Sequence, residues 1–431
     1  MGQGSQQLSP APRATESPQV LYNNYPDPTP TPWVSAVPTP VYTQPPHYPP
    51  VIPPPDYVDL KIPDPLGYQN YFCEPLPKSP ILKYPTDVAV TADGKTVYAI
   101  NSGCNRNIQF GLFLEDLIPE CKNSYMASSS LLKRQLLFRI QNSKAEQLFQ
   151  AAQQNLNCMM GSDLEIDASN QLYLVNQNQN QIERLSSDFQ QKIMISAEKS
   201  QSDGLKQEER AAYYASPQGL QINAGHLFFQ LQNALSVRDY HLRKMDLATG
   251  KHVDLISVTG SDSNITPVQT YAFGKIYQLF SKKPPLANWV KTDNIYTVQG
   301  LSEWDENLFS EGKVPTSRVI YFKQTSAPLI QLYELRAASA DLFYLSDVKN
   351  HQIWVIRLNP DHSEGSLTVL AGSGQKGYQD GQGTAASFYV PTALSLDGAG
   401  NLYVADTGNH AIRKITPGGT VSTVYKAPES E

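Results

Sequence analysis

The sequence has no long apolar run, no basic tract and few cysteines. A membrane-spanning helix needs about 20 predominantly apolar residues, and because no run of that length occurs, no transmembrane helix is expected. The 34 lysines and arginines are scattered and the formal net charge is −6, which argues against nucleic acid or an anionic membrane surface as the partner. Residues 1–8 also lack the cationic and apolar regions of a secretory signal.

Motifs for catalysis or for a resident metal are missing as well. No GxSxG, HExxH, P-loop or dinucleotide fingerprint occurs in a fitting strand–helix context, and paired carboxylates do not recur as a motif. The glycine-rich run 372–377 precedes no predicted helix, so it does not indicate a phosphate cradle. By motif, the sequence therefore gives no catalytic residue, no metal ligand and no cofactor.

Residues 1–55 differ in composition from the rest of the chain. They contain 16 of the 33 prolines and no lysine, and Arg13 is their only cationic side chain. Such a segment cannot bury enough apolar surface to fold, and proline removes backbone donors, so we expect a disordered, polyproline-like spacer. It could be a stalk, a ligand for proline-reading domains or a passive linker.

The stretch 391–425 predicts four short strands in a row, separated by Gly-, Asp- and Asn-rich turns as in consecutive hairpins. One sheet of this kind has two exposed edges and two apolar faces, so it needs copies of itself to be stable. The predicted strands are Thr392–Leu396, Leu402–Ala405, Ala411–Ile415 and Thr420–Tyr425.

Five weaker copies of this frame precede it. All six copies are aligned by an aromatic residue in the second strand, at Tyr98, Tyr173, Phe228, Tyr277, Tyr344 and Tyr403. Four-stranded sheets that recur at the spacing of these aromatic residues indicate a radial array of sheets. We predict an all-β fold: a six-bladed β-propeller of four-stranded antiparallel blades over 84–431, behind a disordered Pro-rich N-terminal segment. Residues 56–83 connect the Pro-rich segment to the first blade, and a strand at either Val58–Ile62 or Ile81–Lys83 could close the ring of blades.

The last copy resembles a known repeat. The run ADTGNHAIRKI (405–415), followed by a glycine turn and VSTVY, is similar to an NHL repeat. The spacer 370–397 resembles the long inter-blade form of bacterial and plant NHL proteins, and a blurred copy of it occupies 203–220. The resemblance implies a six-bladed propeller. It implies no chemistry, because this fold hosts enzymes, receptors and scaffolds alike.

Two regions depart from the repeat. Within 110–160 a helical or loop insertion is expected, with a helix best placed at Ser143–Asn155, although a strand at Leu136–Ile140 would also finish the blade. Within 260–335 we expect a divergent blade with a long exposed loop near 282–317.

All four cysteines lie before residue 160, and none belongs to a CxxC metal pattern. An even number allows three disulfide pairings. One arrangement joins Cys104 to Cys121 within the first blade and Cys73 to Cys158 between the lead-in and the second blade. Four buried free thiols are the alternative. We expect disulfides, since the N-terminal segment independently suggests an extracytoplasmic surface location.

In a four-stranded meander, the second-to-third turn and the connection between blades lie on the same face. Asp406–His410 and Asp347–His351 therefore belong to one rim, which we call the upper face. Some NHL-like lyases hold zinc through histidines, so His351 and His410 would be candidate ligands by resemblance. Both, however, recur at the turn position of the repeat, where hydrogen bonding within the turn explains them better.

Aromatic residues on the upper face are the best candidates for ligand contact. Phe388 and Tyr214 should pack between blades, whereas the tyrosines beside them could stack on a sugar or a peptide. The candidate binding residues are Tyr378, Tyr389, Tyr213, Asp406, His410, Asp347 and His351.

The leading hypothesis is a non-catalytic binding or scaffold module that presents the upper face to a protein, peptide or glycan. We expect a monomer without a cofactor, in an extracytoplasmic location reached through a signal or anchor that this chain no longer carries. The alternative is a metal-dependent propeller enzyme of lyase or lactonase type, with calcium or zinc in the channel.

Overall fold

The structure is a computed structural model of a chain that divides into two compact units, Met1–Pro55 and Asp56–Glu431. The predicted proline-rich segment 1–55 lies outside the residues that the structure describes. These are 72–73, 81–101, 131–132, 136–148, 163–176, 181–185, 189, 192–197, 217–233, 236–258, 265–282, 295–305, 317–323 and 329–428.

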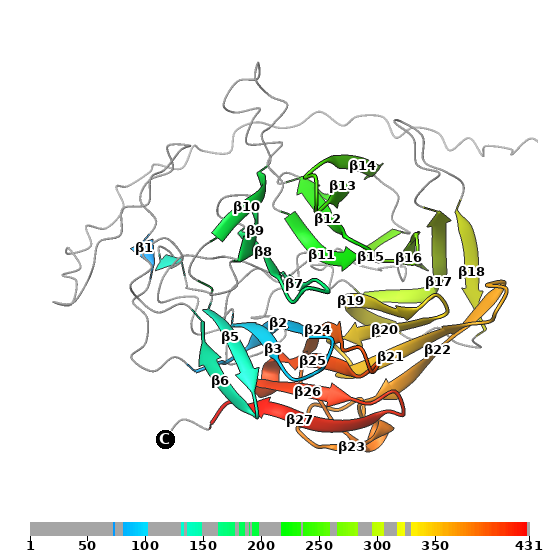
Figure 1. Ribbon diagram of the computed structural model, residues 1–431. Coiled ribbons are helices and arrows are strands. Elements are labelled where there is room, and N and C mark those ends of the chain that lie inside the picture. The colour runs from blue at the N-terminus through cyan, green and yellow to red at the C-terminus, as the bar shows by residue number, and fades with distance from the viewer. Residues whose placement is uncertain are drawn as a thin grey trace, which may run out of the picture. The chain divides into compact units, whose positions relative to one another are not determined.

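The described strands form consecutive antiparallel groups of four, which we call blades 1 to 6 (Figure 1). Blade 1 contains β2 (Pro85–Val90), β3 (Val97–Asn101), β5 (Leu136–Gln141) and β6 (Lys144–Gln147). Blade 2 contains β7 (Leu164–Ile166), β8 (Leu172–Asn176), β9 (Gln181–Leu185) and β10 (Lys192–Ala197). Blade 3 contains β11 (Pro217–Asn223), β12 (His226–Asn233), β13 (Ser236–Asp246) and β14 (His252–Val258).

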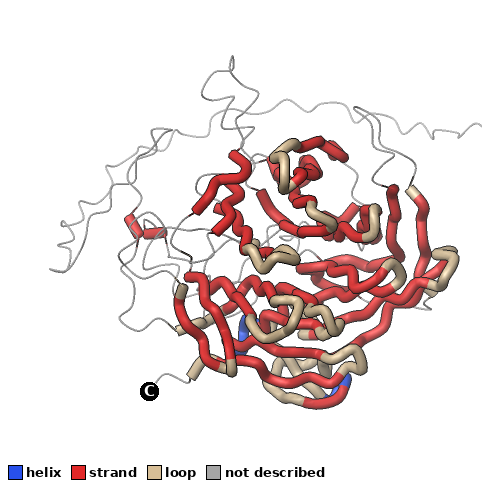
Figure 2. The backbone as a smooth tube through the Cα atoms, in the orientation of Figure 1, coloured by secondary structure: helices blue, strands red, loops and turns tan. Residues whose placement is uncertain are grey.

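The last three blades follow the same plan, except that strand pairing joins blades 4 and 5 into one eight-stranded sheet, and strands dominate throughout (Figure 2). Blade 4 contains β15 (Ile265–Ala272), β16 (Lys275–Lys282), β17 (Ile295–Asp305) and β18 (Arg318–Phe322). Blade 5 contains β19 (Leu329–Ser339), β20 (Leu342–Asp347), β21 (Gln352–Leu358) and β22 (Glu364–Ala371). Blade 6 contains β24 (Pro391–Leu396), β25 (Leu402–Asp406), β26 (Ala411–Ile415) and β27 (Thr420–Lys426), with β23 (Gly381–Gln382) added outside β27. Separately, β1 (Phe72–Cys73) pairs in parallel with β4 (Leu131–Leu132).

The first strands of the blades form a closed ring. In chain order β2 contacts β7, β7 contacts β11, β11 contacts β15, β15 contacts β19, β19 contacts β24, and β24 returns to β2. The predicted all-β propeller of four-stranded antiparallel sheets is thus confirmed. The described part of the chain contains no helix that is long and apolar enough to cross a membrane.

Polar side chains provide hydrogen-bond acceptors for the inner edges of the first strands. The inner edge of a first strand has no neighbouring strand to pair with, and its buried backbone N–H groups still need an acceptor. In each blade, a side chain in or next to the first strand accepts a hydrogen bond from a backbone N–H group. That N–H group lies in or next to the first strand of the following blade. The acceptors and donors are Asp87 and Leu164, Asp163 and Gly219, Gln221 and Tyr271, Thr270 and Ala337, Glu334 and Leu394, and Ser395 and Val90, at 2.6 to 3.3 Å.

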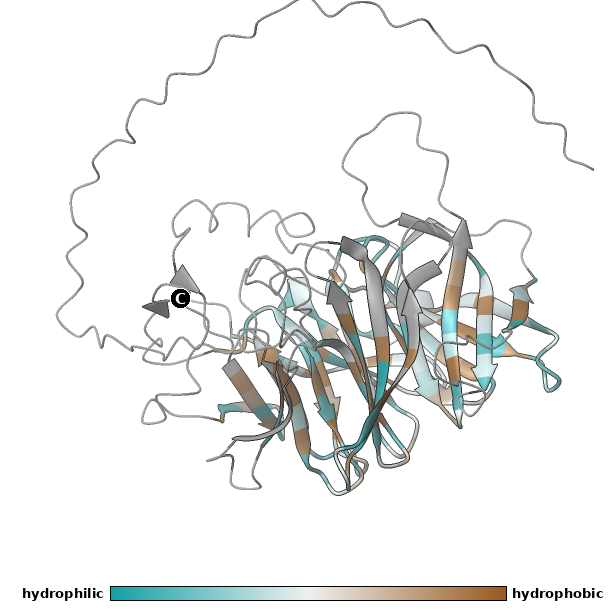
Figure 3. Cartoon of the chain, turned by 90° about the horizontal axis from the view of Figure 1, so that it is seen from above, coloured by the Kyte–Doolittle hydropathy of each residue, from teal (hydrophilic) through white to brown (hydrophobic). Residues whose placement is uncertain are grey.

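The aromatic residue used to align the repeats occupies the second strand of every blade, as predicted. All six of these side chains are buried against neighbouring strands, at Tyr98, Tyr173, Phe228, Tyr277, Tyr344 and Tyr403. Apolar and polar residues alternate along many strands, which buries one set of side chains between blades (Figure 3).

The helix predicted at Ser143–Asn155 is wrong in its first part, because residues 144–147 form β6. Gln141 pairs with Lys144, so Asn142 and Ser143 make a two-residue hairpin turn with φ of 50° and 59°. Two successive positive φ angles are typical of the type I′ turn, whose twist matches that of the strands. The alternative strand over Leu136–Ile140 is confirmed as β5, and residues 149–155 lie outside the described part.

The exposed loop predicted at 282–317 is also wrong in part, since β17 occupies Ile295–Asp305. Leu301 is fully buried there, and Trp304 belongs to the apolar cluster that also contains Phe228 of blade 3. Gly300 permits the close packing, because a Cβ at this position would lie 2.1 Å from the Ile320 carbonyl oxygen. Residues 283–294 and 306–316, on either side, lie outside the described part.

Blades 1 and 6 meet through side chains, without exchanging a strand among the described residues. Ile81–Lys83, one of the two predicted closing segments, is not a strand, and Val58–Ile62 lies outside the described residues. A shared apolar cluster joins the two blades, together with hydrogen bonds from Thr407 Oγ1 to the Pro85 carbonyl (2.7 Å) and from Gly398 N–H to the Ala92 carbonyl (2.8 Å).

Candidate functional site

Two aspartates anchor the turns that carry the predicted rim residues. Asp347 ends β20, and its Oδ1 accepts the backbone N–H groups of Lys349 and Asn350 at 3.2 Å each. Asp406 ends β25, and its Oδ1 accepts the N–H of Tyr389 at 2.8 Å. Both side chains are fully buried, and burial raises the pKa of each carboxyl, that of Asp406 to about 6. These aspartates support the upper face from beneath its surface.

His351 and His410 occupy equivalent turns and connect successive blades. Both have left-handed backbones, with φ of 56° and 53°. Nδ1 of His351 accepts the N–H of Val390 at 3.2 Å, and Nδ1 of His410 accepts the N–H of Tyr84 at 3.2 Å. Val390 and Tyr84 each precede the proline that begins the next blade. The histidines therefore link blade 5 to blade 6 and blade 6 to blade 1, beyond the predicted role within their own turns.

The two described tyrosines of the candidate set differ in exposure. Tyr389 is only 6% exposed, with Lys376 Nζ 3.7 Å over its ring and the His351 ring at its edge. Tyr378 is 39% exposed, and Lys426 Nζ lies 3.7 Å over its ring. Tyr378 is thus the aromatic residue of the set that reaches the surface.

Arg413 fixes the connection between blades 5 and 6 to the body of blade 6. The side chain is fully buried; Nη1 donates to Asp406 at 2.9 Å, and Nη2 donates to Asp380 at 2.6 Å and to the Gln379 carbonyl at 2.9 Å. The guanidinium carbon also lies 4.8 Å from the centre of the Tyr378 ring. The exposed tyrosine therefore stands on a support that is cross-linked by charge-assisted hydrogen bonds.

The remaining candidates are not placed by the structure. Tyr213, Cys104, Cys121 and Cys158 lie outside the described residues, and Cys73 belongs to the two-residue strand β1. The predicted disulfides therefore stay a prediction. Phe388, which was expected to pack between blades, is fully buried in the apolar cluster shared by blades 5 and 6.

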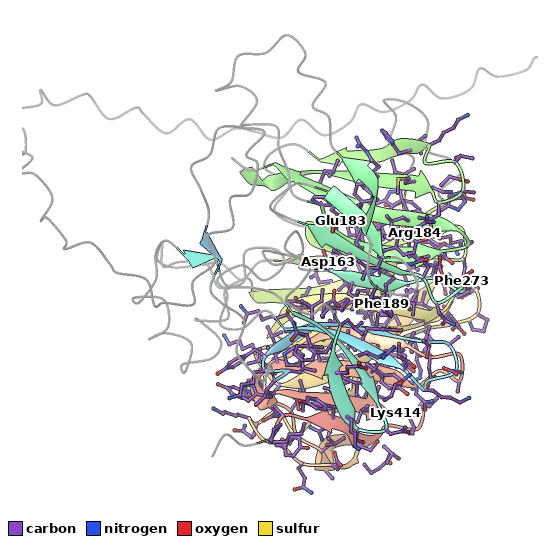
Figure 4. The ribbon with its side chains drawn as sticks, turned by 60° about the vertical axis from the view of Figure 1, so that its left-hand side comes forward. Asp163, Glu183, Arg184, Phe189, Phe273 and Lys414 are labelled. Carbon is purple, nitrogen blue, oxygen red and sulfur yellow. The ribbon has the colours of Figure 1, made fainter. Side chains whose placement is uncertain are left out.

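A group of charged residues that was not predicted from the sequence lies at the centre of the ring. Asp87 on β2 and Asp163 and Glu165 at β7 are buried. Glu334 and Arg336 of β19 are mostly buried, with side chains 13% and 14% exposed. The Arg336 guanidinium pairs with Glu165 and, at 2.6 Å, with Glu334. Figure 4 shows Asp163 well away from Lys414 of blade 6. Acidic residues inside otherwise apolar first strands were the available signal, since buried charges need partners.

Burial dominates the titration of this central group. It raises the pKa of Asp87 well above its usual range, and repulsion from Asp163 and Glu334 adds to the effect. It also raises the pKa of Glu334, and that of Glu165 to about 7, although Arg336 partly opposes both shifts. At neutral pH part of this group is therefore protonated.

A cavity of about 20 Å³ lies among these residues, which is room for about one water molecule. Gln269, in its lining, is 6% exposed, and neither of its amide atoms has a hydrogen-bond partner among the described residues. Across the described ranges, no group of three or more His, Cys, Asp and Glu side chains is placed to hold a metal ion. The central carboxylates of Asp87, Asp163 and Glu334 accept backbone N–H groups of the next blade.

Blade 6 carries the match to a known family. Residues 388–415 match the model of the NHL repeat, over the Asp406, His410 and Arg413 positions described above. Blade 6 therefore carries an NHL repeat within a β-propeller fold. It is 42% identical over 72 residues to "Protein SUPPRESSOR OF QUENCHING 1, chloroplastic" of Arabidopsis thaliana, a match that spans 17% of this chain and only 6% of that protein.

Several solved structures are similar to this chain at low identity. An auxiliary nutrient binding protein from Bacteroides thetaiotaomicron is 16% identical, with 60% of this chain and 56% of that chain covered and a TM-score of 0.39. A virginiamycin B lyase from Staphylococcus aureus is 10% identical over 79% and 84% of the two chains, with a TM-score of 0.38. The hydrazine synthase of Kuenenia stuttgartiensis is 11% identical over 79% and 97%, with a TM-score of 0.46.

Proposed function

We propose that this protein is a non-catalytic binding module that presents the upper face of its propeller to a protein, peptide or glycan. The observation that carries the proposal is the exposed Tyr378 on a fixed support. Its hydroxyl shares a hydrogen bond with Thr423 Oγ1 at 2.9 Å, and Arg413 ties the adjoining chain to blade 6. A preorganised aromatic residue loses little entropy on binding, and aromatic residues contribute strongly at interfaces.

An extracytoplasmic location, a monomeric state and the lack of a cofactor belong to the same proposal. The location is supported by the composition of residues 1–55 and by the even number of cysteines, which would form disulfides in an oxidising compartment. The proline-rich segment would then act as the stalk that holds the propeller away from its anchor.

Peptide and glycan arrays test the binding role directly. The wild-type chain, Tyr378→Ala and Tyr321→Ala would be compared; Tyr321 is a suitable control, because it is 62% exposed on β18 of blade 4. We expect Tyr378→Ala to weaken the bound signals at least about fivefold, the effect of about 1 kcal/mol at an interface residue, while Tyr321→Ala leaves them unchanged. Equal binding by all three proteins would refute the role of this face.

One observation favours the alternative, a propeller enzyme of lyase or lactonase type. Glu165 lies in the centre of the ring with a pKa of about 7, and such perturbed carboxyls are common at active sites. Among the described residues, no group of three or more His, Cys, Asp and Glu side chains is placed around it to hold a metal ion. Elemental analysis for calcium and zinc, with a melting curve before and after chelator, separates the two proposals. One tightly held ion per chain with a chelator-sensitive melting temperature would favour the enzyme.

A further inference from the structure

The cavity at the centre of the ring is lined by an amide whose hydrogen-bonding capacity is unused. Gln269 of β15 is 6% exposed, and neither its Oε1 nor its Nε2 atom has a hydrogen-bond partner among the described residues. A buried polar group without a partner costs free energy, so each such group needs an explanation. A small molecule that binds in the cavity is one explanation.

A second glutamine in the same lining shows the usual behaviour of a buried amide. Gln221 Oε1 accepts hydrogen bonds from Thr270 Oγ1 at 2.8 Å and from the Tyr271 N–H at 3.0 Å. Its Nε2 donates to the carbonyl groups of Gln269 and Leu335, each at 3.3 Å. The lining is therefore well ordered by hydrogen bonds, and Gln269 departs from the pattern set by its neighbour.

Carboxylates supply further acceptors in the lining of the cavity. Asp87 Oδ2 and Glu334 Oε2 accept backbone N–H groups of the next blade at 2.6 and 2.8 Å. A carboxylate oxygen can accept two hydrogen bonds, so these contacts do not exhaust either side chain. Burial raises the pKa of Asp87, and repulsion from Asp163 and Glu334 adds to this effect. A cation in the cavity would be stabilised by the same negative charges.

Size and charge together narrow the class of ligand. The cavity of about 20 Å³ has room for about one water molecule, which is too little for a sugar ring or a nucleobase. In the described part of the chain, no group of three or more His, Cys, Asp and Glu side chains is placed to hold a metal ion. An ammonium group is a cation about as large as a water molecule, and it binds by donating hydrogen bonds to oxygen atoms.

We propose that the central cavity binds an ammonium group, carried by a free ammonium ion or by a small primary amine. Gln269 Oε1 and the carboxylate oxygens of Asp87 and Glu334 accept its hydrogen bonds. The site uses the first strands of the blades and does not involve Tyr378. It therefore goes beyond the proposed function, and it stands or falls separately from binding at the upper face.

Thermal melting in matched salts tests the proposal. The protein would be melted at pH 8 in the chloride salts of ammonium, methylammonium, potassium and tetramethylammonium at equal ionic strength. Tetramethylammonium carries the same charge but has no N–H donor. The variant Gln269→Leu removes both amide atoms at similar volume. Its control, Gln352→Leu, makes the same change at the start of β21, where Gln352 donates to the Gly372 carbonyl at 3.2 Å.

We expect ammonium to raise the melting temperature of the wild type at least about 2 °C above its value in tetramethylammonium. Gln269→Leu should lose at least about half of this difference, and Gln352→Leu should keep it. Each protein is compared with itself in tetramethylammonium, so a change in basal stability does not affect the result. An equal rise in methylammonium would identify the head group of a primary amine as the ligand, and a rise in ammonium alone would identify the free ion.

Three outcomes would overturn the proposal. Equal melting temperatures of the wild type in ammonium and tetramethylammonium would mean that the cavity holds water only. An ammonium response that Gln269→Leu leaves unchanged would place the effect elsewhere in the molecule. A response to potassium as large as that to ammonium would show a general effect of small monovalent cations, in which N–H donors play no part.

Discussion

At the scale of single residues, Arg413 explains why the blade 6 repeat is so well formed. Its fully buried guanidinium serves Asp406, Asp380 and two backbone carbonyls at once, so one side chain joins a strand, a turn and the inter-blade connection. In the ion pair of Arg413 with Asp406, neither side chain is accessible to solvent. A buried ion pair is costly to break, because the remaining charge has no other compensation.

Arg413→Ala should therefore lower the free energy of unfolding by about 3 to 5 kcal/mol, measured by urea denaturation. Lys414→Ala is the matched control at the adjacent, partly exposed position, and we expect it to change stability by less than about 0.5 kcal/mol. A cost for Arg413→Ala as small as that of the control would contradict the anchoring role.

The central carboxyl of Glu165 predicts a pH dependence. Burial raises its pKa from 4.5 in the unfolded chain to about 7 in the folded protein, so the folded state binds the proton more tightly. Its contribution to stability is therefore fully present below about pH 4.5 and is lost as the pH rises through 7.

Relative to Glu165→Gln, the wild type should lose stability at up to about 1.4 kcal/mol per pH unit between pH 4.5 and 7. Urea denaturation of both proteins across this range gives the difference. Parallel pH profiles for the two proteins would show that Glu165 does not titrate in this way.

At the scale of elements, each good repeat is linked to the next through its turn histidine. The Nδ1 atom of His351 accepts the Val390 N–H, so that nitrogen must be unprotonated. Burial lowers the pKa of His351, and the positive charge of Lys376 adds to the effect. A lowered pKa means that this link stabilises the fold above about pH 6.5 and is lost as the pH falls further.

We expect His351→Asn to cost about 1 kcal/mol at pH 8, the value of one hydrogen bond, and progressively less as the pH falls below 6.5. Asparagine tolerates the left-handed backbone, so strain does not confuse the result. His252→Ala, at an exposed position on β14, is the control. A cost that does not depend on pH would mean that the imidazole nitrogen is not the acceptor that matters.

At the scale of the whole molecule, ring closure depends on the contact of blade 6 with blade 1. Side chains from both blades share one apolar cluster, and Tyr403 of β25 donates to the Gly94 carbonyl at 3.1 Å. Because no strand is exchanged among the described residues, the joint relies on side-chain packing and a few hydrogen bonds. The excursion of blade 1 that carries Cys104 and Cys121 follows directly after β3 in the chain.

Disulfides predicted in this first part of the chain would stabilise it by restricting the unfolded state. We expect mass spectrometry after alkylation under denaturing conditions to find no free thiol among Cys73, Cys104, Cys121 and Cys158. A reducing agent should then lower the melting temperature. Alkylation of all four cysteines without prior reduction would exclude the disulfides and remove one support for an extracytoplasmic location.

Turn chemistry and periodicity were readable from the sequence. The four strands of blade 6 begin and end within two residues of their predicted limits, because Gly, Asp and Asn mark each turn. Asp397 caps its turn as expected, accepting the N–H groups of Ala399 and Asn401. Prediction failed where this local signal is weak, at the Asn142–Ser143 hairpin turn and at β17.

The sequence by itself determined the repeat, the alignment of the blades and the position of the rim turns, because these depend on contacts between residues close together in the chain. Only the tertiary structure decided which rim residues are buried, and that His410 of blade 6 accepts the Tyr84 N–H at the start of blade 1. It also revealed the central carboxylates on β2, β7 and β19. These features join segments separated by up to hundreds of residues, and periodicity along the chain carries no information about such contacts.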